Sequence, residues 1–230
     1  MKHSGKARKA AFKLIVISLI AVLVILTVGV FATFLGGVIV VITPGLVVLW
    51  ILFAGFTLYF FRDPTPRVPA GDNLVLSPAH GKVDVIDTTT EPEFMGGDCQ
   101  RISMFLSVMD VHVQNAPVSG TVAFLKYSLG QFLNAMKTES AVYNENVLLG
   151  FETTVPSRQK IGVRLIAGAV ARRIVPYVQA GEQVTRGDRI SLIQFGSRAD
   201  VYLPAQAKIR VKLGDHVVGG ETVLAGFESL

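Results

Sequence analysis

Hydrophobic residues fill one long stretch near the start of the chain and later recur in short runs between polar residues. From Leu14 to Phe61, a run of 48 residues contains no Lys, Arg, Asp, Glu or His. One bilayer crossing needs about 20 apolar residues, so this run is too long for one helix and suits two. Gly36-Gly37 and Pro44-Gly45 are the plausible breaks. The pattern predicts a helical hairpin, with helices at about 13–35 and 40–61.

The remainder, residues 62–230, is rich in Val and Ile and is interrupted about every eight to twelve residues by Gly, Pro or Asp. This spacing predicts a mainly β domain of short strands. The segment Leu129–Glu139 is compatible with a short helix or a loop. The predicted strands are Val83–Ile86, Ile102–Leu106, Ile161–Ile166, Ile190–Gln194, Asp200–Leu203 and Lys208–Lys212.

One internal repeat relates residues 181–190 to residues 214–223. Both segments have the form G-[ED]-x-V-x-x-G-[DE]-x-[VI], in which glycines permit turns and apolar residues face a core. This style is typical of the barrel-sandwich hybrid of biotinyl and lipoyl carriers. A carrier needs a lysine at the hairpin tip, and the tips Thr185-Arg186 and Val218-Gly219 have none. The repeat therefore predicts a barrel-sandwich-hybrid-like fold and no carrier site.

Composition and charge narrow the class of protein further. With 50% hydrophobic and 17% charged residues, the chain is not a disordered one. Its single cysteine, Cys99, excludes a disulfide framework and multi-cysteine metal sites. The net charge of +5 comes from five basic residues before Leu14, because Lys and Arg equal Asp and Glu in number elsewhere. A nucleic-acid-binding face is therefore not predicted.

The basic tail also predicts the topology. Positive charges flanking a membrane helix stay in the cytoplasm, which places residues 1–13 there. Two crossings through 14–61 then return residues 62–230 to the cytoplasmic side of the cell (inner) membrane. The alternative is one crossing plus a re-entrant segment, which would place the domain outside.

Motifs of the common catalytic classes are not found, including a Walker loop, GxGxxG after a strand, HExxH and GxSxG. His3 and His216 are predicted to be solvated. His80 and His112 lie in unusual contexts, although the pattern alone favours a structural role for each. Gly196-Ser197-Arg198 between two predicted strands is, by itself, typical of a hairpin turn.

Five blocks, taken together and in order, resemble the phosphatidylserine decarboxylase family in its short prokaryotic form. The resemblance extends from about residue 58 to the end of the chain, and the apolar hairpin before it also fits. The blocks are Phe60-Phe61-Arg62-Asp63-Pro64, Ser77–Val83, Asp110–Gly120, Ala171–Val175 and Phe195–Pro204.

The resemblance implies a self-cleaving proenzyme. The chain would break between Gly196 and Ser197 into fragments 1–196 and 197–230, which remain together as a heterodimer or a higher oligomer. Ser197 would become a covalent pyruvoyl group, with no metal required. This group would form a Schiff base with membrane phosphatidylserine and release phosphatidylethanolamine and CO2.

The resemblance also implies roles for the two unusual histidines. His112 aligns with a family histidine linked to catalysis and is the candidate general acid/base. His80 stands where the family has Asp, in a Pro-Ala-Asp-Gly pattern whose acid assists self-cleavage. Either His80 is itself the base, or Asp110 or Glu145 replaces the missing acid, or maturation is slow or absent.

The lipid phosphate would be bound by guanidinium groups, which bind phosphate through two parallel hydrogen bonds. The candidates are Arg198, Arg172 and Arg173. Two rival hypotheses are a homologue that never cleaves and a non-enzymatic, membrane-anchored adaptor with a barrel-sandwich domain. Such adaptors normally carry a long heptad hairpin, which residues 62–230 lack.

Overall fold

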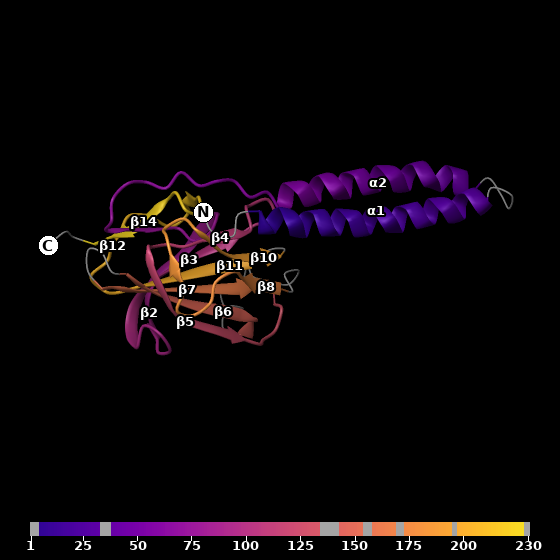
Figure 1. Ribbon diagram of the computed structural model, residues 1–230. Helices are drawn as coiled ribbons and strands as arrows, with labels where there is room; N and C mark the ends of the chain where they lie inside the picture. Colours follow the sequence, from indigo (N-terminus) through magenta and orange to yellow (C-terminus); the bar gives the residue numbers. More distant parts are fainter. Residues whose placement is uncertain are drawn as a thin grey trace. The chain divides into compact units, whose positions relative to one another are not determined.

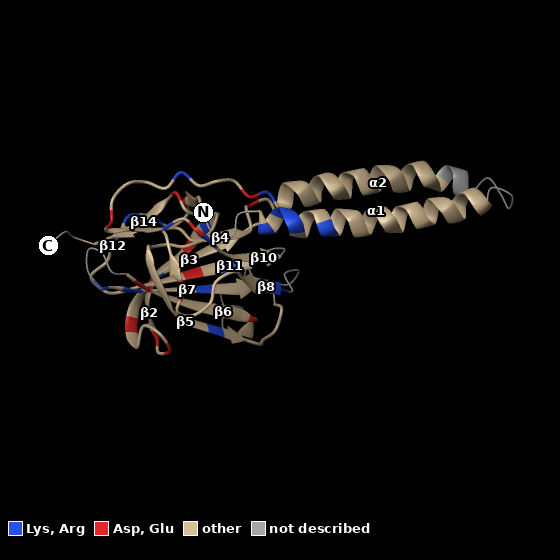
Figure 2. Cartoon of the chain, viewed as in Figure 1, with Lys and Arg blue, Asp and Glu red and all other residues tan. Residues whose placement is uncertain are grey.

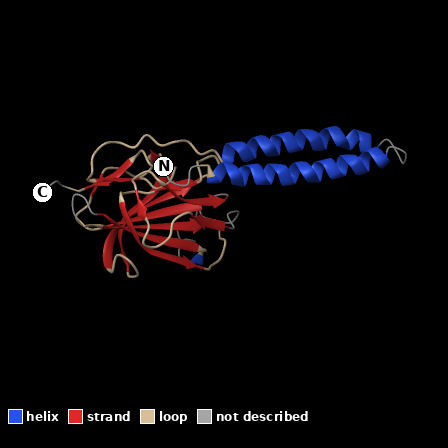
Figure 3. Ribbon diagram, viewed as in Figure 1, coloured by secondary structure: helices blue, strands red, loops and turns tan. Residues whose placement is uncertain are grey.

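The computed structural model describes residues 5–32, 38–133, 143–153, 158–168, 173–194 and 197–227. Contacts divide the chain into two compact units, Gly5–Asp63 and the segment that begins at Pro64. The first unit is a pair of helices and the second is built mainly of strands (Figures 1 and 3). The predicted fold class, mainly β with an amino-terminal helical pair, is confirmed.

The helical unit contains α1 (Lys6–Ala32) and α2 (Val38–Phe60), both long and apolar enough to cross a membrane. Helix α1 begins before the predicted residue 13, because the Lys, Arg and Ala of the basic tail favour helix. Its charges lie only in its first turns, and the described part of α2 has none (Figure 2). Trp50 Nε1 donates to Ser18 Oγ at 2.9 Å and joins the two helices. Pro44, a candidate break, instead lies within α2.

In its described residues, the second unit contains three antiparallel sheets. The small sheets have the orders β1-β14-β12 and β4-β10-β8, and the large sheet is curled and has eight strands (Figure 1). Five of the six predicted strands lie within observed strands, and in the sixth, Lys208–Lys212, only the first two residues form a strand. The strands are β1 (Leu74–Leu76), β2 (Gly81–Glu91), β3 (Gly97–Leu106), β4 (Val113–Asn115), β5 (Gly120–Ser128), β6 (Asn146–Thr153), β7 (Lys160–Ala167), β8 (Arg173–Pro176), β9 (Gln183–Val184), β10 (Arg189–Gln194), β11 (Ser197–Leu203), β12 (Lys208–Ile209), β13 (His216–Val217) and β14 (Val223–Gly226).

The large sheet has the strand order β13-β2-β3-β11-β7-β6-β5-β9. This order is symmetric about its centre when each strand is matched with the one at the same distance from the opposite edge. We call β13, β2, β3 and β11 the first half, and β9, β5, β6 and β7 the second half. The ladders are irregular at matching places, between Val83 and Val85 in β2 and between Val122 and Phe124 in β5. The two halves are therefore related by an approximate two-fold axis between β11 and β7.

The repeat predicted from the sequence supplies one turn to each half. Gly181 N donates to Val122 O at 2.8 Å, and Gly214 N donates to Val83 O at the same distance. The repeat glycines Gly181, Gly187, Gly214 and Gly220 have φ of 89°, 85°, 92° and 73°, a region that favours glycine. The segment 129–133 is irregular, and the rest of the predicted Leu129–Glu139 element lies outside the described residues.

A second repeat was not recognised in the sequence. Residues 77–83 and 116–122 both read x-Pro-x-x-Gly-x-Val and lead into β2 and β5. Their contacts are reciprocal, because Leu76 N donates to Pro117 O at 2.9 Å and Asn115 N donates to Pro78 O at 2.8 Å. The duplication thus extends beyond the turns to the entry of each half.

Alternating residues of the central strands fill the core between the sheets. Met104, Leu165, Ala199 and Val201 are fully buried, and they belong to one continuous apolar cluster. Because strand side chains alternate between faces, Arg198 and Asp200 lie on the opposite face of β11 from Ala199 and Val201.

Candidate active site

Ser197 is the first residue of β11, at the centre of the large sheet. It pairs with Leu106 of β3 on one side and Ala167 of β7 on the other. Its side chain is fully buried, and Oγ has no hydrogen-bond partner among the described residues. Leaving a buried hydroxyl unpaired costs free energy, and such exceptions point to a strained or reactive site. Gly196 and Phe195 lie outside the described residues.

The loop between β3 and β4 carries His112 to this segment. The loop leaves β3 at Leu106, beside Ser197, and returns to β10, where Ile193 N donates to His112 O at 3.1 Å. His112 is completely buried, and its Nδ1 is 2.9 Å from Asp110 O. A carbonyl only accepts, so Nδ1 carries the proton in this contact.

Asp110 organises this loop. Its Oδ2 accepts from Ser107 N at 2.8 Å and from Ser107 Oγ at 2.9 Å. Its Oδ1 is 2.9 Å from His216 Nε2, so His216 is bound as well as 59% exposed. The prediction that His216 is merely solvated therefore missed a contact between residues far apart in the sequence. Because both of its carboxylate oxygens are engaged, Asp110 fixes the loop between β3 and β4 and holds it to His216.

His80 lies at the entry to β2, two strands from Ser197. The next residue, Gly81, passes so close to β3 that a Cβ on it would lie 2.5 Å from Phe105 O. A Cβ on Gly219 would lie 3.1 Å from both His80 Cδ2 and Asn115 Oδ1. His80 is half-buried, and the small Gly219 makes room for its ring.

Glu145 lies on the other side of Ser197, because its carbonyl accepts from the N–H of Ala167, the strand partner of Ser197. The Glu145 side chain is buried and accepts a hydrogen bond from the Tyr127 hydroxyl. Burial and this bond raise the pKa of Tyr127 to about 12. Glu145 is thus an engaged acceptor near the site.

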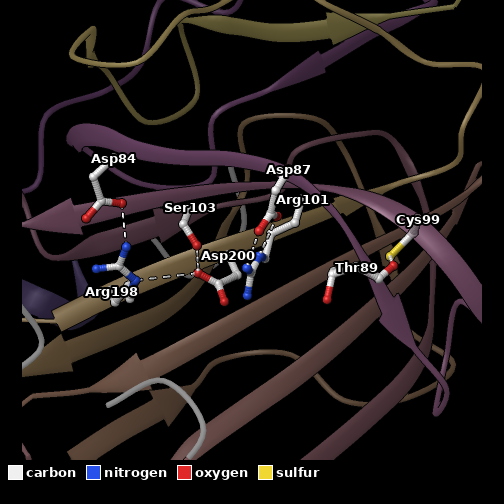
Figure 4. A network of polar contacts seen from close by, with 8 residues as sticks. All are labelled: Asp84, Asp87, Thr89, Cys99, Arg101, Ser103, Arg198 and Asp200. Carbon is white, nitrogen blue, oxygen red and sulfur yellow. Dashed lines mark hydrogen bonds and ion pairs between the residues drawn. The ribbon is translucent and has the colours of Figure 1, made fainter. Parts of the chain in front are cut away.

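The three candidate arginines differ in their surroundings. Arg173 is exposed at the start of β8 and pairs with Gln194, three residues before Ser197. Arg198 is 1% exposed and forms an ion pair with Asp84 (Figure 4). Arg172 lies outside the described residues.

A buried polar network on the outer face of β11 was missed by the sequence reasoning. Asp200 accepts from Ser103 Oγ, and its Oδ1 is 3.8 Å from Arg198 Nε (Figure 4). Burial raises the pKa of Asp200, against the opposing effects of Ser103 and Arg198. The alternation Ser-Arg-Ala-Asp in β11 was a signal that Arg198 and Asp200 share a face.

The described residues contain no group of three His, Cys, Asp or Glu side chains that could hold a metal ion. Cys99 is buried, and burial, together with Glu91, raises the pKa of its thiol. A thiol in this setting is poorly reactive. The reactive candidates that remain are Ser197 and the histidines.

Comparison with known proteins gives a consistent result. The sequence profile of the family described as phosphatidylserine decarboxylase matches residues 53–225. A phosphatidylserine decarboxylase proenzyme of Desulfotalea psychrophila is 42% identical over 176 residues, which cover 76% of this chain and 81% of that protein. A protein of the same name from Symbiobacterium thermophilum is 40% identical over 197 residues, covering 83% and 91%. One from Rickettsia akari is 42% identical over 173 residues, covering 74% of each.

Proposed function

This chain belongs to the phosphatidylserine decarboxylase family and is a decarboxylase, and we propose that it makes its own pyruvoyl prosthetic group from Ser197. The observation that carries this proposal is the buried Ser197 Oγ without a partner among the described residues. A hydroxyl retained in an apolar core at this cost suits a group that is consumed in a reaction. The residues present therefore fit the prosthetic group.

Self-cleavage needs only atoms of the chain and one water. Ser197 Oγ attacks the Gly196 carbonyl carbon, the peptide C–N bond breaks, and the hydroxyl proton passes to the new amine. A base then removes the Ser197 α-proton, and the ester C–O bond breaks to leave fragment 1–196 with a carboxylate end. The dehydroalanine left on fragment 197–230 takes up water and loses ammonia, which yields the pyruvoyl group.

We assign the proton transfers to the histidines. His112 Nδ1 is held by Asp110 O, and complete burial keeps bulk water from competing for protons at its ring. We assign His80 to cleavage, because it stands where the family has the acid that assists self-cleavage and because it lies at the entry to β2, two strands from Ser197.

The pyruvoyl group, once formed, supplies the carbonyl and the electron sink needed for loss of CO2 from an amino acid headgroup. Arg173 is our candidate for the lipid phosphate, because its exposed guanidinium lies beside the strand that leads to Ser197. Arg172 adjoins it in sequence. Arg198, which is buried and paired, is assigned a different role below.

The surface at the Ser197 end of the sheet supports a lipid substrate. Met109 follows the end of β3, and Leu129 and Tyr143 flank the neighbouring ends of β5 and β6. The strand registers place these ends in line with Ser197, and the three side chains are 56%, 87% and 60% exposed. Exposed apolar groups around one site are typical of surfaces that meet a membrane.

The proposed organisation follows from this assignment. Residues 1–13 form a basic cytoplasmic tail, 14–61 a membrane hairpin, and 62–230 a catalytic domain on the cytoplasmic side of the cell membrane. The hairpin keeps the domain where phosphatidylserine lies. Fragments 1–196 and 197–230 remain together as a heterodimer.

Intact-mass analysis of the detergent-purified full chain, beside a Ser197→Ala variant, tests the proposal. We expect fragment 197–230 with a pyruvoyl mass at its first position, and only uncut chain in the variant. The cut protein should release CO2 from phosphatidylserine in mixed micelles. An uncut wild-type chain would overturn the proposal and favour a homologue that never cleaves or a membrane-anchored adaptor.

A further inference from the structure

Arg198, the residue that follows the proposed cleavage site, has a buried and paired side chain. Strand alternation sends its side chain to the face opposite Ala199, where it is 1% exposed. Its guanidinium forms an ion pair with Asp84 of β2, and its Nε is 3.8 Å from Asp200 Oδ1 (Figure 4). β3 lies between β2 and β11, so the Asp84–Arg198 pair spans three neighbouring strands.

The ladder irregularity in β2 makes this pair possible. Asp84 is the extra residue between Val83, which pairs with Met104, and Val85, which pairs with Ser103. An extra residue re-aims its side chain relative to the regular alternation. Ser103 completes the arrangement by donating to Asp200. We call Asp84, Ser103, Arg198 and Asp200 the anchor cluster.

The second half of the sheet shows what the same backbone looks like without such a cluster. Ser103 pairs with Val85 and Asp200, and its equivalent Gly150 pairs with Phe124 and Gly162. Gly162 is therefore the equivalent of Asp200. The same matching relates Asp84 to Ala123 and Arg198 to Lys160.

Aromatic rings occupy the corresponding space in the second half. A Cβ on Gly150 would lie 2.5 Å from the Phe94 ring, and one on Gly162 would lie 3.1 Å from Tyr202. Lys160 Nζ donates to Phe94 O at 3.1 Å. The same backbone arrangement thus forms in the second half without these side chains, and among the described residues of the sheet the anchor cluster occurs only in the half that carries Ser197.

We propose that the anchor cluster positions the end of β11 after cleavage, with Arg198 as a positioning residue for the group formed from Ser197. The inference rests on the proposed function. Cleavage removes the covalent link before residue 197, and the first residues of a strand fray when they are not tied down. A part-buried, charge-assisted bond from the second residue supplies the missing restraint.

The test compares Asp84→Asn with Asp87→Asn in the full chain. Asp87 is a matched control, because it also lies on β2 and pairs with an arginine, its Oδ1 accepting from Arg101 Nε at 2.9 Å. Hydrogen exchange of amides 198–200 is measured in cut protein and in the uncut Ser197→Ala background. We expect Asp84→Asn to speed exchange about tenfold in cut protein and little in uncut chain. Asp87→Asn should do neither.

Kinetics give a second readout in cut protein. Asp84→Asn should lower kcat about tenfold or more at nearly constant KM, because misplacing a reacting group affects the chemical step. Asp84→Glu should restore part of the loss. If Asp84→Asn folds poorly, Ser103→Ala serves as a milder change to the same cluster. It should also lower kcat.

Two results overturn the inference while the proposed function stands. One is equal exchange for Asp84→Asn and Asp87→Asn in cut protein. The other is an equal rise in cut and uncut chain, which indicates a general structural role. A wild-type chain that stays uncut overturns the proposed function itself, and with it the need for an anchor.

Discussion

The two halves of the large sheet share a backbone and differ in what they place on it. Both enter through an x-Pro-x-x-Gly-x-Val segment, carry an irregular ladder three residues into the long strand, and receive one repeat turn. The first half has Ser103 and Asp200 where the second has Gly150 and Gly162. A duplicated scaffold can therefore keep the same backbone in both halves while a buried hydroxyl and a buried acid occur at these positions in only one half.

The segments that enter the two halves also share a backbone and differ in their side chains. His80 corresponds to Ser119, and Gly219 to Arg186, and each pair is in contact within its own half. Where the first half has a large ring against a glycine, the second has Arg186 N donating to the small Ser119 Oγ at 2.9 Å. The larger residue lies on the entry segment in the first half and on the turn in the second, so the turn fits in both halves, and only the first half has a histidine at this position.

The largest expected effect is on the rate of cleavage, when His80, which differs from its equivalent Ser119, is replaced. His80→Ala should leave the chain uncut, slowing cleavage about 10²-fold or more, because the proton acceptor is lost. His80→Asp should still mature. Cleavage over time, followed by intact mass, measures both.

Ser119→Ala is the control at the equivalent position and should mature at the wild-type rate. Normal cleavage of His80→Ala would remove His80 from the mechanism and return the role to Asp110 or Glu145.

A smaller effect is expected where the halves agree, at Gly81 and Gly120. A Cβ at either position would overlap a backbone carbonyl, that of Phe105 or Glu152. Alanine at Gly81 should therefore lower the free energy of unfolding by about 1–3 kcal/mol. Alanine at Gly120 should cost more, because φ there is +155°.

Urea unfolding of the uncut Ser197→Ala chain measures both losses. A loss below about 0.5 kcal/mol at either glycine would show that the backbones can separate, and the two-fold constraint would then be weaker than we describe.

The smallest expected effect is on the pH dependence of stability, to which Asp200 can contribute and its equivalent Gly162 cannot. Burial raises the pKa of Asp200, so the folded chain binds this proton more tightly than the unfolded chain does. Stability should therefore fall as pH rises above the ordinary Asp pKa of about 3.9 toward the raised value. Asp200→Asn should flatten this slope in urea unfolding at a series of pH values. An unchanged slope would mean that Asp200 does not carry it.

Much of the fold was predictable from local pattern. The apolar run predicted two helices, and Val- and Ile-rich runs predicted strands, because burial dictates both periodicities. The four turn glycines followed from the repeat. The second repeat escaped notice because its shared residues are few, although Pro, Gly and Val recur at the same spacing from Ser77 and from Ala116.

Contacts between distant segments were not predictable. The alternation in β11 shows that Arg198 and Asp200 share a face, but the partner Asp84 is aimed by a ladder irregularity that no local pattern marks. The Asp110–His216 contact joins residues 106 apart in the chain. The roles of Ser197, His112 and Arg173 remain predictions, based on resemblance and now on placement, and the role of Gly196 is a prediction based on resemblance alone.

The strand order has a consequence for the lifetime of the enzyme that the proposed cleavage would produce. β11 lies between β3 and β7, β13 pairs with β2, and β14 lies between β1 and β12. If the chain is cleaved as proposed, fragment 197–230 can depart only if ladders in two sheets open together, which amounts to unfolding. Two populations of mature enzyme, mixed and incubated, would not trade small fragments. Each molecule would retain the single reactive group that it formed, and chemical damage to that group would permanently inactivate the whole molecule.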